Sequence, residues 1–122
     1  MNAITQYRYK EIAKEYGLKC HIVKPNDKWC KANGIDQYTN NSCCSPNEIW
    51  VGIFEKKEWE IASFFHEIGH TMIRFSTSSP TKWHLELDAW LYGIREAQKH
   101  GYFISPETFN EFVLPCLNSY KD

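Results

Sequence analysis

The spacing of apolar and polar residues changes along the first half of the chain. Residues 5–16 carry apolar side chains every three or four positions, which predicts an amphipathic helix ended by Gly17. Residues 18–23 alternate, and residues 48–54 are β-branched and aromatic, so each segment predicts a short strand. Between them, residues 26–47 are rich in Asn, Ser, Asp and Cys and favour a long loop or an irregular pair of strands.

The second half of the chain has helical spacing almost throughout. Residues 56–75 and 84–100 each predict a helix, and a polar break that contains Pro80 separates them. Ser105 suits the cap of a further helix, which Pro115 is expected to kink or shorten. The predicted order is α, β, β, α, α, α, which indicates an α+β domain with a small sheet.

Length and composition narrow the class of protein. The 122 residues are enough for a single domain, and a hydrophobic content of 43% predicts a packed core. The net charge of -1 provides no broad basic face, so we expect no nucleic-acid partner. No apolar run approaches the length of a membrane span and no signal peptide opens the chain, so we expect a cytoplasmic protein without membrane association.

The five cysteines fit the same compartment. Their odd number favours reduced thiols. Cys30, Cys43 and Cys44 lie close together in the sequence and leave a small metal or disulfide site open. No CxxC pair is present, so ordinary loop or half-buried thiols are the favoured interpretation.

One stretch of the predicted helix over residues 56–75 has the spacing of a metal site. In the sequence SFFHEIGHTMI, His66 and His70 lie one helical turn apart and can direct two imidazole nitrogens at one ion. Glu67 can reach a water beside that ion, as in the HExxH arrangement of zinc peptidases. The histidines adjoin the apolar arc of the helix, at a position where a buried helix is expected to meet a cleft. The competing interpretation is an ordinary core helix that carries two histidines with no metal role. Gly69 costs about 1 kcal/mol relative to alanine, and would let another backbone approach closely.

A zinc site of this kind needs a third protein ligand, and three residues downstream are candidates. In helical projection Glu86 lies on the apolar side of the helix over residues 84–100, whereas Asp88 lies on the opposite face. His84, at the start of the helix, remains a third candidate. A carboxylate on the apolar side needs a cation, so Glu86 is favoured. The predicted inward arc comprises Glu86, Leu87, Ala89, Trp90, Leu91, Gly93, Ile94 and Ala97, and its small residues suit close packing against Gly69.

HEIGH followed by E-x-D-A-W resembles the gluzincin peptidases, most closely the small ImmA/IrrE-like metallopeptidase domains. Their pattern is HE-x-GH followed by E-x-E/D-A, in which the first acid is the metal ligand. The resemblance covers about residues 3–101 and implies a compact zincin-like domain in which Glu86 completes the Zn²⁺ site. One departure is Trp90, which stands where related gluzincins often carry Asp or Asn. The metzincin pattern does not fit, because Ile73 and Ser76 occupy its glycine and third-histidine positions.

The expected activity is zinc-dependent hydrolysis of a peptide bond in a protein substrate. Zn²⁺ held by His66, His70 and Glu86 would activate a water, and Glu67 would accept its proton. An extended substrate is expected to pair with the strand over residues 48–54, unless that strand is plain sheet core. The resemblance implies a regulatory substrate such as a phage or mobile-element repressor.

Two other functions remain possible on the sequence. The first is a zincin-fold protein that binds metal and regulates a partner without cleaving it, although the retained Glu67 argues against this. The second is a SprT-like, DNA-associated protease with His84 as third ligand, against which the near-neutral charge argues. For the oxyanion donor, Tyr92 is predicted to face outward, and His84, Tyr102 and His100 stay open without support from spacing.

Overall fold

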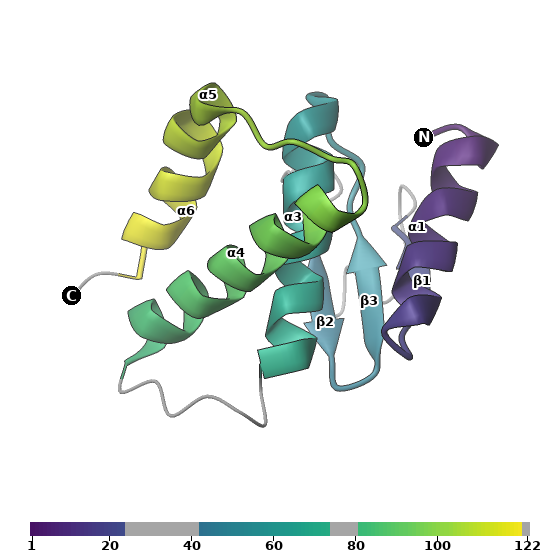
Figure 1. Cartoon of the computed structure of the whole chain (residues 1–122), viewed down its shortest axis with the longest axis horizontal. Coiled ribbons are helices and arrows are strands. Elements are labelled where there is room, and N and C mark those ends of the chain that lie inside the picture. Colours follow the sequence, from purple (N-terminus) through teal and green to yellow (C-terminus); the bar gives the residue numbers. More distant parts are fainter. Residues whose placement is uncertain (24–41, 74–80, 121–122) are drawn as a thin grey trace.

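The computed structural model describes residues 1–23, 42–73 and 81–120, which form a compact, mixed α+β structure (Figure 1). In chain order the elements are α1 (Ala3–Glu15), β1 (Lys19–Ile22), β2 (Cys43–Ser45), β3 (Glu48–Val51), α3 (Lys57–Ile73), α4 (Lys82–Lys99), α5 (Pro106–Thr108), the π-helical turn η1 (Phe109–Val113) and α6 (Leu114–Asn118). In Figure 1, α1 and the segment from α5 to α6 lie at opposite ends, with α3 between them. The predicted fold class is therefore confirmed at the level of α+β.

Three short strands form the sheet, in the order β1-β3-β2. β1 pairs with β3 in parallel, and β2 pairs with β3 antiparallel as a tight hairpin. β2 falls inside the segment predicted to be a loop or irregular strands, while residues 24–41 of that segment lie outside the described residues. Because β3 has a partner on each side, it cannot be the strand along which a substrate pairs, and that expectation was wrong.

One face of the sheet packs on the helices. Ile49 and Val51 of β3 are completely buried, whereas Glu48 and Trp50, which alternate with them, are half-buried, as the two-residue period of a strand requires. The predicted strand over residues 48–54 ends at Val51. The face that carries Ile49 and Val51 thus holds the sheet against the helical part of the core.

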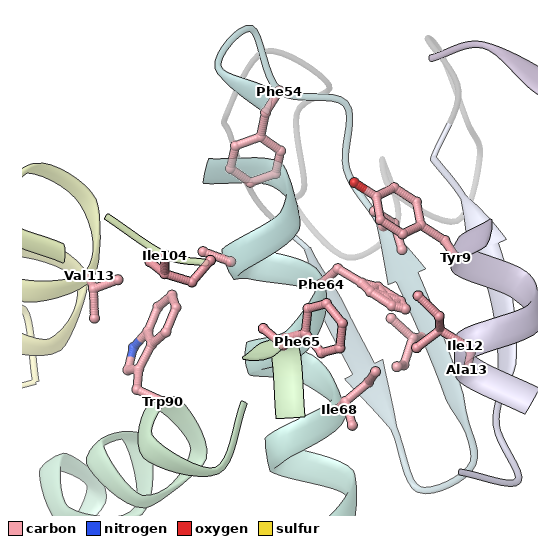
Figure 2. Close-up of a cluster of buried hydrophobic side chains, with 14 of the residues drawn as sticks. Tyr9, Ile12, Ala13, Phe54, Phe64, Phe65, Ile68, Trp90, Ile104 and Val113 are labelled. Carbon is pink, nitrogen blue, oxygen red and sulfur yellow. The ribbon is translucent and has the colours of Figure 1, made fainter. Parts of the chain in front are cut away.

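α1 packs on the N-terminal half of α3. Asn2 caps α1 by accepting a hydrogen bond from the backbone N–H of Thr5 at 2.8 Å, which satisfies a donor that the helix leaves unpaired. The ring of Tyr9 stacks on Phe64 with centroids 4.6 Å apart. Figure 2 shows this contact beside Ile12 of α1 and Ile68 of α3. The hydroxyl of Tyr9 donates to the buried carboxylate of Glu60 at 2.9 Å. The helix predicted over residues 5–16 is therefore confirmed.

α3 is the central helix and is covered on almost every side. Every residue from Ala62 to Gly69 is buried, although the sequence predicted a single apolar arc. The sheet and α1 cover one side, and α4 packs across the other (Figure 1). The predicted continuation of α3 to residue 75 lies outside the described residues.

α4 begins and ends at clear signals. The side chain of Thr81 accepts from the backbone N–H of His84, and Gly101 leaves the helix with a φ of 83°, in the left-handed region that favours glycine. The helix starts two residues before the predicted position. Leu91, predicted to face inward, is 55% exposed, so the buried stripe of α4 is narrower than the helical projection indicated.

The C-terminal segment contains the predicted cap and an unexpected turn. Ser105 caps α5 by accepting from the backbone N–H of Thr108. Pro115 was expected to kink or shorten the helix, but the chain stays helical through it. The preceding turn widens instead: the N–H of Leu114 donates to the carbonyl of Phe109, five residues back. Among the described helices, none is long and apolar enough to cross a membrane.

Candidate metal centre

α3 and α4 cross at two glycines, and this crossing builds the site. A Cβ atom on Gly69 would lie 2.2 Å from the backbone oxygen of Ala89, and a Cβ on Gly93 would lie 2.4 Å from that of Phe65. Each helix therefore presents a glycine to the backbone of the other. The expectation that Gly69 meets the small residues of the next helix is confirmed. This contact brings the start of α4, with Glu86, against the end of α3.

His66, His70 and Glu86 meet at this crossing. The Oε2 atom of Glu86 lies 2.9 Å from Nε2 of His66 and 3.0 Å from Nε2 of His70, and the two nitrogens are 3.1 Å apart. Within the described part of the chain, these residues are the only group of three or more His, Cys, Asp or Glu side chains arranged to hold a metal ion. The structure therefore brings together the three residues that the sequence singled out.

The spacing and chemistry of the three atoms suit a small divalent cation. Ligands about 2.0–2.2 Å from a tetrahedral zinc ion stand about 3.3 Å apart, close to the separations found here. Burial lowers the pKa of His66 to about 4, so its imidazole is neutral and available as a ligand. Burial raises the pKa of Glu86, but hydrogen bonds with His66 and His70 outweigh it and hold that pKa near 2. Two imidazoles and one carboxylate are therefore a ligand set of the kind that Zn²⁺ accepts.

Glu67 lies beside this group but is not part of it. Its side chain is buried, and burial raises the pKa of its carboxyl to about 7. Cys44, on β2, lines the same pocket as Glu67. A carboxyl with a pKa near neutrality can both accept and return a proton at physiological pH, which is what a general acid–base residue requires.

The four residues share one pocket of about 430 Å³. Its walls come from β2, α3 and α4 and from the segment between η1 and the C-terminus, which places the site between the sheet and the last helix. The lining residues are Ser42, Cys44, Ser63, His66, Glu67, His70, Glu86, Trp90, Phe112, Cys116, Ser119 and Tyr120. The pocket is large enough for a few substrate side chains and the peptide bond between them.

Trp90 contacts His66 in an unusual way. The two rings stack with their centroids 3.8 Å apart and their planes 20° from parallel. Nδ1 of His66 is buried and has no hydrogen-bond partner among the described residues. A metal-binding histidine commonly donates this N–H to an acceptor that fixes the ring. Such an acceptor would lie in the plane of the imidazole, whereas the indole lies against its face, so a stacking contact in place of a hydrogen bond restricts the orientation of His66.

The competing third ligands lie elsewhere. Asp88 is exposed on the outer face of α4, as the helical projection predicted. His84 is also exposed, and its Nδ1 lies 2.7 Å from the hydroxyl of Thr81 at the cap of the helix. Neither residue lines the pocket. Of the three candidates, Glu86 alone meets the two histidines.

The residues considered as oxyanion donors are not at the site either. Tyr92, His84, Tyr102 and His100 are all absent from the pocket lining, whereas Tyr120 is part of it. Burial raises the pKa of Tyr120, and the charges of the two pocket glutamates raise it further. No spacing rule connects residue 120 to the motif. Tyr120 reaches the pocket only because the C-terminal helix packs on α4.

Comparisons of the chain with protein-family models, with curated proteins and with solved structures give no match. The assignment of a function therefore depends on the chemistry of the site and on the residues that carry the gluzincin resemblance.

Proposed function

We propose that this protein is a zincin-like, zinc-dependent metallopeptidase that hydrolyses a peptide bond of a protein substrate. The observation that carries the proposal is the meeting of His66, His70 and Glu86 in a pocket that Glu67 also lines. A site that held a metal only for structural reasons would need neither an open coordination position for a water nor a general base beside an open pocket. The order of the residues in HEIGH and E-x-D-A supports the same class.

His66, His70 and Glu86 would hold the ion. Zn²⁺, when bound, supplies a Lewis acid that lowers the pKa of a water and polarises the scissile carbonyl. Glu67 accepts the proton of the attacking water and returns it to the amine that leaves.

Two further parts of the pocket serve the substrate. The hydroxyl of Tyr120 is the donor that stabilises the developing oxyanion, since it lies in the pocket with both glutamates. Within the described residues β2 is the outer strand next to the pocket, whose lining includes Cys44 of β2 and the preceding Ser42. An extended substrate pairs with β2 in place of β3, a mode that recognises backbone more than sequence.

The substrate class follows from the resemblance alone. ImmA/IrrE-like domains often act on a single regulatory protein, and we place a phage or mobile-element repressor in a bacterial cytoplasm among the substrates of this chain. The alternative function is a metal-binding zincin-fold protein that regulates its partner by binding. The two are separated by whether Glu67 is needed for activity.

Metal content tests the site first. Protein reconstituted with Zn²⁺ is expected to bind about one ion per chain, measured by mass spectrometry of the metal after dialysis. Glu86→Ala loses the ion, while Asp88→Ala, on the exposed face of the same helix, keeps it. Equal losses in the two variants, or no zinc in the parent protein, would show that the ligands are assigned wrongly.

Substrate cleavage tests the reaction. Glu67→Gln is expected to keep zinc but lose hydrolysis, so it should retain its substrate when incubated with a cytosolic extract. Proteins that co-purify with it are then exposed to wild-type protein and to Glu86→Ala, and new termini are identified by peptide mass spectrometry. New termini that need both Glu67 and Glu86 support a peptidase. Full biological activity of Glu67→Gln would support regulation by binding.

A further inference from the structure

Lys82 carries a positive charge to the rim of the metal pocket. It lies four residues before Glu86 on α4, so the two side chains share one face of the helix, about one turn apart. The Nζ atom of Lys82 lies over the ring of Tyr120, 5.2 Å from the ring centre. Tyr120 and Glu86 both line the pocket, and Lys82 is exposed to solvent beside them.

The contact with Tyr120 distinguishes Lys82 from other cations that lie over aromatic rings in the described residues. These other pairs are Arg8 with Tyr102, Lys56 with Trp59 and Arg95 with Tyr92. None of their three rings belongs to the pocket lining. The ring contact of Lys82 therefore holds its ammonium group next to the candidate metal centre.

No acid among the described residues forms an ion pair with Lys82. The ion pairs found in this part of the chain join other residues, and the first turn of α4 contains no Asp or Glu. The helix dipole also disfavours a cation in the first turn of a helix. The position of Lys82 is therefore unfavourable for α4 by itself, and the charge stays available to a bound molecule.

The pocket does not neutralise this charge once a divalent ion is bound. Glu67 and Glu86 are the acids of the described lining, and together they carry at most two negative charges. A divalent ion supplies two positive charges, so the charge of Lys82 is left over. A cleft with an excess of one sign of charge attracts ligands of the opposite sign.

We propose that Lys82 is a specificity-determining residue that binds a carboxylate of the protein substrate close to the bond that is cut. The proposal rests on the proposed function, because it takes Glu86 as a ligand of the catalytic ion. One helical turn corresponds to about two residues of an extended peptide, so the carboxylate belongs within about two residues of that bond. Its source is either an Asp or Glu side chain or the free end of the substrate chain.

Hydroxamates that carry one amino acid test the charge preference and separate the two sources. Each compound binds the metal through its hydroxamate group. The first pair carries Asp or Asn, both with an amidated end, and the second carries Ala with a free or an amidated end. The protein is loaded with Co²⁺, and the visible absorption of the ion follows the titration. The acid of at least one pair is expected to bind about threefold to fivefold more tightly than its neutral partner, the upper range for an exposed ion pair.

A preference within the Asp and Asn pair identifies an acidic side chain as the group that Lys82 recognises. A preference within the Ala pair identifies the end of the chain. In either case the preference should shrink as the salt concentration rises from about 0.01 M to about 1 M, because salt screens exposed charges.

The variants assign the preference to Lys82. Lys82→Met removes the charge but keeps a flexible side chain that packs on an aromatic ring, so it should abolish the preference without changing the Co²⁺ stoichiometry. Lys82→Arg keeps the charge and should keep the preference to within about twofold. Lys56→Met is the matched control, since Lys56 also lies over a ring, 4.6 Å from the centre of Trp59, but away from the pocket. It should behave as wild type.

The outcomes separate this proposal from the proposed function. Equal affinities within both pairs for wild-type protein would overturn the role of Lys82, and so would an undiminished preference in Lys82→Met. Either result, obtained with one Co²⁺ bound per chain, leaves the metal site and the proposed function intact. A wild-type protein that binds neither Co²⁺ nor Zn²⁺ would refute the proposed function and the role of Lys82 with it.

Discussion

Replacing Gly69 by alanine would place one methyl group where the backbone of α4 lies. Its Cβ atom would stand 2.2 Å from the backbone oxygen of Ala89 and 2.9 Å from its carbonyl carbon. Real Cβ atoms essentially never approach a neighbour below 3.0 Å, so the two helices must separate by about 0.8 Å at this point. The obstacle is backbone, which cannot rotate away as a side chain does.

The energetic cost follows from two opposing effects. Alanine is the better helix former and gains about 1 kcal/mol. Overpacking a tight contact typically costs about 1–3 kcal/mol, and a clash with backbone belongs at the upper end of that range. The net expectation is that the free energy of unfolding falls by about 2 kcal/mol. Metal-ligand distances tolerate changes of only about 0.2 Å, so a displacement of Glu86 by several tenths of an ångström weakens zinc binding by about tenfold or more.

The assays are urea unfolding of the metal-free protein and zinc titration against a chromophoric chelator. Gly93→Ala should behave like Gly69→Ala, because its Cβ atom would lie 2.4 Å from the backbone oxygen of Phe65. Gln98→Ala, an exposed substitution on α4, should leave stability and zinc affinity unchanged. Wild-type stability in Gly69→Ala would refute the packing argument. A loss of stability with unchanged zinc affinity would refute the link between the helix crossing and the ligands.

Three other predictions concern single side chains. Tyr120→Phe keeps zinc but lowers kcat by about tenfold or more in the hydrolysis assay, since one oxyanion donor is lost; an unchanged kcat would exclude that role. Trp90→Leu weakens zinc binding in the chelator assay by about threefold to tenfold, the scale of a ring contact, and Trp90→Phe by less; equal effects would contradict orientation by stacking. Burial lowers the pKa of His100, but its hydrogen bond with Glu15 raises it overall. The stabilisation from this pair is therefore complete at pH values below the pKa of His100 in the unfolded chain, and it is lost as the pH rises through the pKa of His100 in the folded protein. His100→Gln should thus lower the free energy of unfolding more near about pH 5.5 than near about pH 9. A loss that does not change with pH, measured by urea unfolding, would contradict this prediction.

Much of the local structure could be predicted from the sequence because its causes are local. The helix from Ala3 to Glu15, the cap at Ser105 and the end of α4 at Gly101 all follow from spacing and from the conformations that single residues favour. The strand β2 and the π-helical turn before Pro115 were not predicted. β2 depends on its partner strand β3, which a pattern within its own segment does not contain. The π-helical turn lies directly before Pro115, where a kink or a shorter helix was expected.

The residues of the candidate site also separate into those whose placement could be predicted from the sequence and those whose placement could not. His66 and His70 are fixed relative to each other by four residues of helix, so the sequence alone determines that they share a face. Helical projection could place Glu86 on the inner side of α4, but only the two glycine contacts between the helices decide that it lies 3.0 Å from His70. The same projection put Leu91 inside, because it contains no information on how wide a stripe the neighbouring helix covers.

By itself, the sequence determined the histidine pair, the glutamate between them and the favoured third ligand. Tertiary structure decided the rest: the presence of Cys44 and Tyr120 in the pocket and the stacking of Trp90 on His66. The physical reason is distance along the chain. Residues within one helix hold their geometry through backbone hydrogen bonds, whereas residues on separate elements meet only where the core packs them together.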